Sequence, residues 1–478
     1  MTDCPLSTGR QTRNLIVYSV NVGLIYLGAS VLYVGLAQAA LLDKLGASKT
    51  IANLPSSAYF WMTPVPIIVA WYFCAVRQLK PVLVGSYLLA AMGGAGVAVS
   101  LLVETPDWAR GALVAVNERL PDYLHLPVDW VVPALIIHAA TLGCVFGIVA
   151  TYQWEVIGKG VADHRRGRAL ALAFGVGPIL AFVGSLASQL ILTGTVEIAL
   201  PADMRLGLTI DPIEYPKNFA ILFGATVPMM ALAALLSMLF TVPAPSVEPS
   251  RPPFVSGLFG GLGDFLSNRN ILIAAIATIL VASGYNILNN MSLFTEERLG
   301  SAAEKYIGYQ QSLRFGFKAV AGLFLGWLLT RTHAKAGLLV TGAFCLASVA
   351  WVLLASGQWF LLSFGIMGMG ELFGVYYPNY ILCCSAKSKM RRNMAFTSML
   401  NMPSGFAPLL FGQIADRVGR ATGDKKFGFE MSFWASIAIL AATLLLVQFA
   451  LPARPRPRES DFEDVDRAPE KASPITES

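Results

Sequence analysis

Twelve long apolar stretches dominate the sequence and leave it few folds to adopt. Each has about the length, roughly 20 residues, that an α-helix needs to cross the hydrocarbon core of a bilayer. Inside that core only helices and closed barrels satisfy every backbone polar group, so the stretches predict membrane-spanning helices. Charged residues make up 13% of the chain and the mean hydropathy is +0.60, which excludes an ordinary soluble domain. The predicted spans are 14–38, 55–76, 81–103, 130–154, 168–192, 217–241, 271–293, 306–329, 337–356, 359–383, 394–413 and 430–451.

Lys and Arg residues are concentrated in every second loop, and these loops lie on one side of the predicted membrane. Arg165 and Arg166 follow span 4, and similar groups lie in other loops of the same side. The positive-inside rule then places both termini in the cytoplasm, with the chain in an inner or plasma membrane. The loop 414–429 departs from this rule, because it is outer by count and yet basic. The net charge of +6 belongs to these loops, so it does not predict nucleic-acid binding.

The sequence also lacks the motifs of membrane-embedded enzymes. No His-Glu-x-x-His sequence, phosphate-binding glycine loop or pair of catalytic carboxylates lies in the spans. None of the six cysteines falls in an outer loop, so no disulfide framework is predicted. We therefore expect no enzyme activity, no cofactor and no metal.

The two halves of the chain repeat one another. The segment 43–46 after span 1 matches 297–300 after span 7, and 143–147 in span 4 matches 370–374 in span 10. Because six spans is an even number, the two halves have the same orientation in the membrane. Parallel repeats of this kind are found in secondary transporters, whose solute site lies near the midplane between the halves.

The repeat also predicts the domain organisation. The Pro-, Gly- and Ser-rich stretch between the halves indicates a linker with a short helix, and the polar C-terminal tail is predicted to be disordered. Two long outer loops, 104–129 and 193–216, belong to the first half. The predicted parts are a cytoplasmic N-terminus (1–13), a six-helix bundle (14–241), a cytoplasmic linker (242–270), a second six-helix bundle (271–452) and the tail (453–478).

With twelve spans in two parallel six-span repeats and a long central linker, the chain resembles the major facilitator superfamily over about residues 10–452. The family's loop signature, Gly-x-x-x-Asp-Arg-x-Gly-Arg, is reduced to Arg77 and Lys80 after span 2, and its second copy keeps Gly326 and Arg331. The resemblance implies an all-α transporter, acting as a monomer, in which spans 1, 4, 7 and 10 line the central cavity. It also implies gate roles for Arg77, Gly326 and Arg331.

A closer match to the signature, residues 412–420, follows span 11. By the predicted topology that end of span 11 is outside, the wrong side for this signature. We interpret the string as a helix-ending turn rather than a gate. The family's span 4 arginine is also missing, so the sequence does not assign a subfamily.

Apart from the first residues of three spans, three strongly charged side chains lie inside the predicted spans: Arg314, Lys318 and Glu371. An ionisable group in a hydrocarbon-spanning helix is costly and marks a functional-site hypothesis. Arg314 and Lys318 are four residues apart, hence on one face of span 8. At 1.5 Å per residue Lys318 lies about 18 Å deep, level with Glu371 of span 10 at about 17 Å. The repeat places no charged counterparts in the first half.

Other polar side chains extend the candidate site, with the asparagines near the outer third of span 7 and Tyr377 below Glu371 in span 10. Gln311 continues the polar stripe of span 8, and Asn286, Asn290 and Tyr377 are further candidates for solute contacts. For the asparagines, hydrogen bonding between helices is an equal alternative. His138 of span 4 lies about 12 Å deep and is a second candidate for proton transfer, although a packed histidine is the commoner case.

Three hypotheses describe the charged residues. Glu371 pairs with one cation and leaves the other for an anionic solute; Glu371 or Lys318 takes up and releases a proton; or the three residues join spans 8 and 10 structurally. We favour a proton-coupled symporter of a small polar solute, with a preference for an anion, working by rocking of the two bundles. The alternatives are a sugar, polyol or nucleoside carrier and, in another class, a transport-inactive sensor with the same fold.

Overall fold

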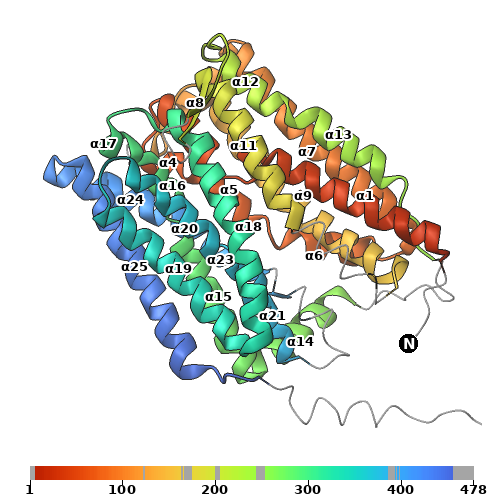
Figure 1. Cartoon of the computed structure of the whole chain (residues 1–478). Coiled ribbons are helices and arrows are strands. Elements are labelled where there is room, and N and C mark those ends of the chain that lie inside the picture. Colours follow the sequence, from red (N-terminus) through yellow and green to blue (C-terminus); the bar gives the residue numbers. More distant parts are fainter. Residues whose placement is uncertain are drawn as a thin grey trace, which may run out of the picture.

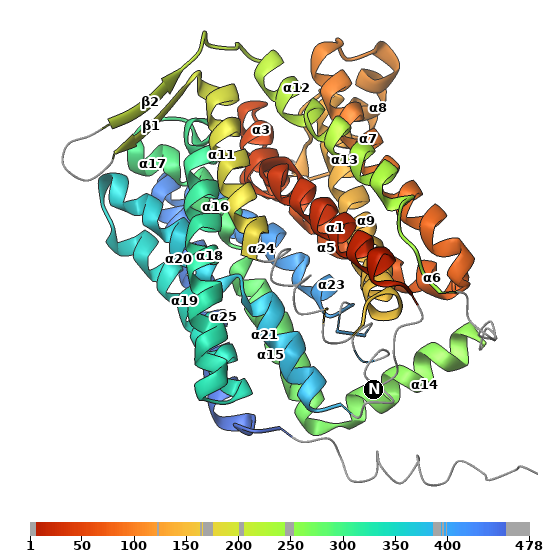
Figure 2. The same ribbon diagram turned by 45° about the vertical axis from the view of Figure 1, so that its right-hand side comes forward.

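The computed structural model describes residues 6–121, 124–162, 165, 175–199, 205–243, 253–385, 393, 396–397 and 399–455. Within them the chain is almost entirely helical, with one two-stranded antiparallel sheet. Figures 1 and 2 show two helical bundles, one from each half of the sequence. The bundles meet at one end of the molecule and lie further apart toward the end that holds the N-terminus. We call the first the outer end and the second the inner end, after the predicted topology.

The first bundle is built from helices of very different lengths. Its elements are α1 (Thr8–Leu27), α2 (Ala29–Leu32), α3 (Leu36–Lys44), α4 (Lys49–Ala52), α5 (Leu54–Trp61), α6 (Val65–Tyr72), η1 (Val76–Gln78), α7 (Leu79–Leu102), α8 (Asp107–Asn117), α9 (Val131–Gly160), α11 (Gly177–Thr193), β1 (Thr195–Ala199), β2 (Arg205–Thr209), α12 (Lys217–Gly224) and α13 (Thr226–Ser237).

The second bundle follows the linker helix α14 (Phe254–Ser267). Its elements are α15 (Arg269–Tyr285), α16 (Leu288–Leu293), α17 (Thr295–Leu299), η4 (Ala303–Tyr306), α18 (Ile307–Arg331), α19 (Ala334–Leu354), η5 (Gly357–Leu361), α20 (Leu362–Gly370), α21 (Phe373–Cys383), α23 (Asn401–Ser404), α24 (Phe406–Thr422) and α25 (Lys425–Ala450). The predicted tail from residue 456 onward, and residues 244–252 of the linker, lie outside the described residues.

The described residues contain eight helices long and apolar enough to cross a membrane, and these correspond to predicted spans 3, 4, 6, 7, 8, 9, 10 and 12. The other predicted spans are interrupted or only partly described. Residues 168–174 of span 5 lie outside the described residues, and its described part contains the apolar helix α11. Spans 1 and 2 and the described part of span 11 are each divided among consecutive helices, of which α1 is the longest at 20 residues. The fold is that of an all-α integral membrane protein.

The break in span 1 brings the first bundle into contact with the second. Gly35 has φ of +154°, a conformation that L side chains rarely adopt, and a Cβ there would lie 2.9 Å from Asn289 Oδ1. Only glycine meets both conditions without strain. Two residues earlier, the ring of Tyr33 lies with its centroid 5.3 Å from that of Phe315 on α18.

The internal repeat is visible in the backbone at the outer end. Gly46, after α3, has φ of +82°, and its sequence counterpart Gly300, after α17, has φ of +65°. Both glycines take the left-handed conformation that ends a helix without a Cβ clash. The two halves therefore share this turn as well as its sequence.

The long outer loops of the first half each contain regular structure. In the first, Ala109 and Leu113 of α8 are buried while Trp108 is exposed. In the second, β1 and β2 pair antiparallel with Thr195 opposite Thr209. This hairpin was not predicted, although apolar residues alternate in both strands, at Val196 and Ile198 and at Leu206 and Leu208.

The string 412–420 is part of a helix, so its interpretation as a helix-ending turn is wrong. Helix α24 continues through Gly419 to Thr422 and ends at Gly423, which has φ of +70°. Arg420 Nε donates to the carbonyl of Asp416, 3.2 Å away, and Gly428 of α25 packs against the carbonyl of Ala415. Gly428 is therefore the glycine that this tight helix pair requires, because a Cβ on Gly419 would meet nothing closer than 3.4 Å, and Gly419 does not end the helix.

Candidate functional site

Arg314, Lys318 and Glu371 form one ion-paired cluster. Arg314 Nε donates to Glu371 Oε2 at 2.8 Å and its Nη2 donates to Oε1 at 3.0 Å, a bidentate pair. Lys318 Nζ lies 3.1 Å from the same Oε1. The equal depth predicted for Lys318 and Glu371 agrees with this ion pair. One carboxylate thus neutralises one of two cations, and the cluster carries a formal charge of +1 when all three groups are ionised.

The side chains of the cluster are mostly buried but keep some exposure to solvent. The side chain of Arg314 is 5% exposed, that of Lys318 11% and that of Glu371 13%. Removing two ions from water is costly, and a close pair recovers that cost only with good geometry and further hydrogen bonds. The bidentate contact supplies the geometry on one side. On the other side Lys318, an ammonium with three donors, uses one of them on Glu371.

Two local features hold the carboxylate against α18. Helix α20 ends at Gly370, so Glu371 lies at the junction with α21. Three residues earlier, on α20, a Cβ on Gly368 would lie 1.9 Å from the carbonyl oxygen of Arg314. Only a glycine allows the two backbones to approach this closely, and that approach places Glu371 within reach of both cations.

Aromatic rings from both halves surround the cations. The guanidinium carbon of Arg314 lies 5.3 Å from the ring centroid of Phe315 and 5.8 Å from that of Tyr33. Lys318 Nζ lies 5.7 and 5.8 Å from the same two centroids. Tyr26 of α1 stacks on Tyr33 at 5.7 Å. Since Tyr26 and Tyr33 belong to the first half, the cluster lies at the boundary between the two bundles.

Two polar side chains complete the surroundings of Arg314. Tyr285 accepts a hydrogen bond from Arg314 Nη2 at 2.5 Å, and Gln311 Oε1 accepts one from Nη1 at 3.1 Å. The amide Nε2 of Gln311 is buried and has no hydrogen-bond partner among the described residues. A buried donor without a partner costs free energy, so Gln311 has a free donor beside the cluster.

The asparagines predicted to contact solute have protein partners. Asn286 Nδ2 donates to the carbonyl of Ser404 at 3.0 Å. Asn290 Nδ2 donates to the carbonyl of Phe411 at 3.0 Å, and its Oδ1 accepts from Asn53 of the first half at 2.8 Å. These bonds agree with the alternative prediction for the asparagines, which was hydrogen bonding between helices rather than contact with solute. The Asn290 amide is engaged at the outer contact between the bundles, and the Asn286 amide is engaged within the second bundle.

The contacts that His138 and Tyr377 make are with residues outside the charged cluster. His138 is fully buried within the first bundle, against Gly93 and with its ring 5.6 Å from that of Phe223. Neither of its ring nitrogens has a hydrogen-bond partner among the described residues. Tyr377 is also fully buried, and its hydroxyl donates to the carbonyl of Leu338 at 3.5 Å.

The residues assigned to gates by resemblance lie on the surface. Arg77 in η1, Gly326 on α18 and Arg331 at the end of α18 are all exposed. A Cβ on Gly326 would meet no atom within 4 Å. Their gate roles stay a prediction.

Sequence reasoning left the aromatic surroundings out of the site. Tyr26 and Tyr33 are seven residues apart on span 1, a spacing that aligns them on one face of an uninterrupted helix. Gly28 and Gly35, which flank this region, were the signal that span 1 is broken here.

Two bundles of membrane-spanning helices, joined by a linker and enclosing a charged cluster at their boundary, define the architecture of a membrane transporter. The sequence matches the model of the Major Facilitator Superfamily over residues 19–402. The chain belongs to this superfamily. Comparison with curated protein sequences gives no match.

Solved transporter structures share the fold at low sequence identity. A D-xylose–proton symporter aligns with a TM-score of 0.64 and 13% identity over 93% of this chain and 98% of its own. A peptide transporter POT in complex with sulfate gives 0.62 and 13% over 91% and 94%. A variant of the nucleoside transporter NupG gives 0.59 and 12% over 91% and 99%. At these identities the likeness establishes the fold alone.

Proposed function

We propose that the chain is a proton-coupled secondary transporter of a small anionic solute, with Arg314, Lys318 and Glu371 as its solute and proton site. The observation that carries the proposal is one carboxylate shared by two cations at the boundary of the bundles. A structural pair needs only one cation for each carboxylate. The second cation, with the free amide of Gln311, is suited to an anionic group of the solute.

Charge balance couples the proton to the solute. With Glu371 ionised the cluster carries +1, and protonation of Glu371 raises this to +2. A solute carboxylate or phosphate monoanion then restores +1. Because an added unpaired charge in a mostly buried site is costly, each of the two ligands favours the binding of the other. Bound together, they leave the site with its original charge.

The aromatic rings suit the remainder of the solute. Tyr33 and Phe315 present ring faces beside the cations, and Tyr26 extends this surface into the first bundle. Because these rings come from both halves, a solute bound here contacts both bundles. Rocking of the bundles about the site would then expose it to one side of the membrane at a time.

The proposal also covers location and assembly. The distribution of Lys and Arg supports an inner or plasma membrane with both termini in the cytoplasm. The protein works as a monomer, since the cluster and its aromatic surroundings come from a single chain. A proton-driven relative with the same fold, the D-xylose–proton symporter, supports symport.

Uptake into proteoliposomes tests this function. With purified protein and a panel of small carboxylates, phosphate esters and sugars, we expect an inward proton gradient to drive accumulation of an anion. Lys318→Met should weaken the apparent affinity for that anion about tenfold, since hydrogen bonds to charged groups are worth roughly 1.5–3 kcal/mol.

The matched control is Lys426→Met, which removes a half-exposed lysine from the same bundle, paired with Glu430 at 3.9 Å. It should leave affinity unchanged. Unchanged anion affinity in both Lys318→Met and Arg314→Gln would contradict the anion site. Accumulation of sugars alone would favour the carrier of neutral solutes, and absence of flux across the whole panel would favour a sensor.

A further inference from the structure

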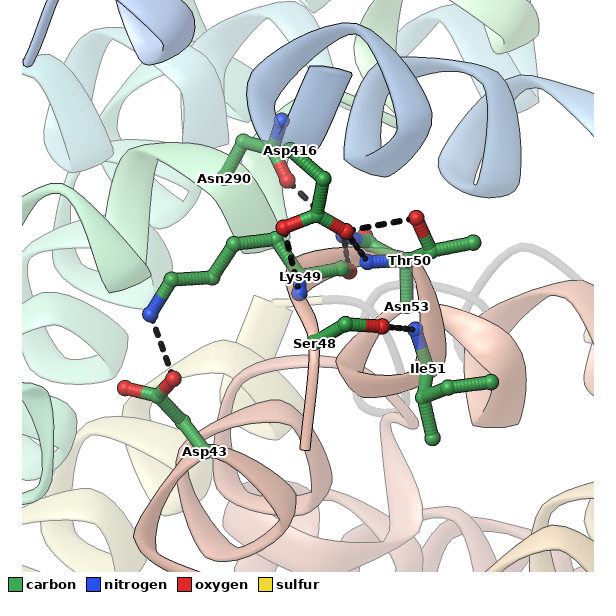
Figure 3. Close-up of polar contacts among 8 residues, drawn as sticks. All are labelled: Asp43, Ser48, Lys49, Thr50, Ile51, Asn53, Asn290 and Asp416. Atoms are coloured by element: carbon green, nitrogen blue, oxygen red, sulfur yellow. Dashed lines mark hydrogen bonds and ion pairs between the residues drawn. The ribbon is translucent and has the colours of Figure 1, made fainter. Parts of the chain in front are cut away.

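A carboxylate of the second bundle binds the backbone of the first at the outer end. Asp416 of α24 accepts through Oδ1 from the amide of Lys49 at 3.0 Å and through Oδ2 from the amide of Thr50 at 2.8 Å. Oδ2 also accepts from the Thr50 hydroxyl at 2.6 Å (Figure 3). Both amides are at the start of α4, and a helix leaves its first amides without intrahelical partners.

The backbones are in direct contact at the same point. Gly412, one turn before Asp416 on α24, would place a Cβ 2.6 Å from the carbonyl oxygen of Lys49 and 2.7 Å from Thr50 Cα. A glycine and a carboxylate therefore share one face of α24 and meet the same two residues of the other bundle. Gly412 permits the approach, and Asp416 satisfies the amides that the approach brings within reach.

The side chain of Lys49 takes no part in this contact. Its ammonium pairs with Asp43, on the same half, and points away from Asp416 (Figure 3). Asn53 continues the contact inward, since its Nδ2 donates to both the Lys49 carbonyl and Asn290 Oδ1, at 2.8 Å each. The bond network thus runs between the bundles and is anchored on backbone groups of α4.

From this geometry we propose that Asp416 is a latch that holds the outer end closed. If the outer end opens, α24 separates from α4, and the carboxylate loses three hydrogen bonds at once. Hydrogen bonds to an ionised acceptor are about twice as strong as neutral ones, so Asp416 stabilises the outer-closed state specifically. In the outer-open state both its oxygens and the two amides bind water.

A cysteine introduced in place of Ser57 would report on the equilibrium between the outer-closed and outer-open states. Ser57 is fully buried, one turn after Asn53 and one turn before Trp61. Both of those residues contact the second bundle: Asn53 through Asn290, and Trp61 through Phe406, whose ring centroid is 5.3 Å away. A maleimide can reach a thiol on this face only when the outer end opens.

The experiment measures maleimide labelling of purified Ser57→Cys protein whose six native cysteines have been replaced. Asp416→Asn keeps the side-chain size but removes the charge and one acceptor. We expect it to raise the labelling rate about tenfold, the ratio that corresponds to losing roughly 1.4 kcal/mol of closed-state stabilisation.

Asp424→Asn is the matched control. Asp424 also caps a helix, accepting from the amide of Phe427 at 3.1 Å, but that helix, α25, belongs to its own bundle. The labelling rate should not change. A second reporter retains only native Cys345, fully buried within the second bundle, and its labelling should stay slow in Asp416→Asn. The latch is overturned if Asp416→Asn labels at the parent rate, or if labelling of Cys345 rises in parallel, because that outcome means general loosening.

Discussion

Glu371→Gln is expected to abolish proton-driven accumulation while leaving solute exchange across the membrane intact. Glutamine cannot take up the proton, and it resembles a glutamate that is permanently protonated. The two cations then hold the anion with no competing carboxylate, so exchange of labelled for unlabelled solute should proceed and lose its dependence on pH. Because the proton gradient then no longer drives entry of the solute, we expect the internal concentration not to rise above the external one.

Two measurements on the same proteoliposomes separate these effects. Uptake under an inward proton gradient reports accumulation, and counterflow at equal pH reports exchange. Glu430→Gln, a partly exposed glutamate of the same bundle, is the control and should keep both. Intact accumulation in Glu371→Gln, with its pH dependence unchanged, would refute Glu371 as the proton site.

The same substitution has a structural cost that must be measured beside it. Removing one partner of a buried ion pair leaves unpaired charge, and this typically costs about 3–5 kcal/mol. Bound anion should return part of this stability to Glu371→Gln, because it supplies the missing negative charge. Thermal unfolding with and without the transported anion therefore gives a readout of the site that does not depend on flux.

The sequence was sufficient for the fold because bilayer physics leaves few choices. Apolar length predicts helices, and the match between segments 43–46 and 297–300 predicts the two halves. The breaks were harder to predict. Span 1 is divided near Gly28 and Gly35 for a tertiary reason, since Gly35 packs against Asn289 of the other bundle. The local sequence around Gly35 does not indicate its contact with Asn289.

The sequence predicted the charged residues of the candidate site better than its uncharged polar residues, because charges are rare in the spans and polar groups are common there. Arg314, Lys318 and Glu371 stand out because ions are costly in lipid, and depth along each helix was enough to bring them together. His138 was predicted to lie level with Arg314, but depth does not specify which face of a helix a side chain occupies. Asn290 was predicted near the outer third of span 7, away from the level of the cluster. Asn290 bonds across the outer contact, and His138 packs inside its own bundle.

Gly368→Ala is expected to disrupt the site without touching any of its charges. The added Cβ would lie 1.9 Å from the Arg314 carbonyl oxygen, whereas carbon and oxygen normally approach no closer than about 3.3 Å. The oxygen belongs to the backbone of α18 and the position of the Cβ is fixed by the backbone of α20, so no side-chain rotation relieves the clash, and α20 must move away from α18 by about an ångström or more. We expect a loss of stability of about 1–3 kcal/mol, as in other overpacked interiors.

The displacement matters for function because Glu371 follows Gly368 by less than one turn. A shift of this size lengthens the 2.8 and 3.0 Å contacts between Arg314 and Glu371 beyond hydrogen-bonding distance. Transport should therefore fall at least tenfold, together with the midpoint of thermal unfolding. Gly374→Ala is the matched control, three residues beyond Glu371, where a Cβ would meet nothing within 4 Å. If both variants unfold and transport alike, the close approach of α18 and α20 does not set the geometry of the charged cluster. A selective loss in Gly368→Ala means that backbone packing positions the carboxylate between its two cations.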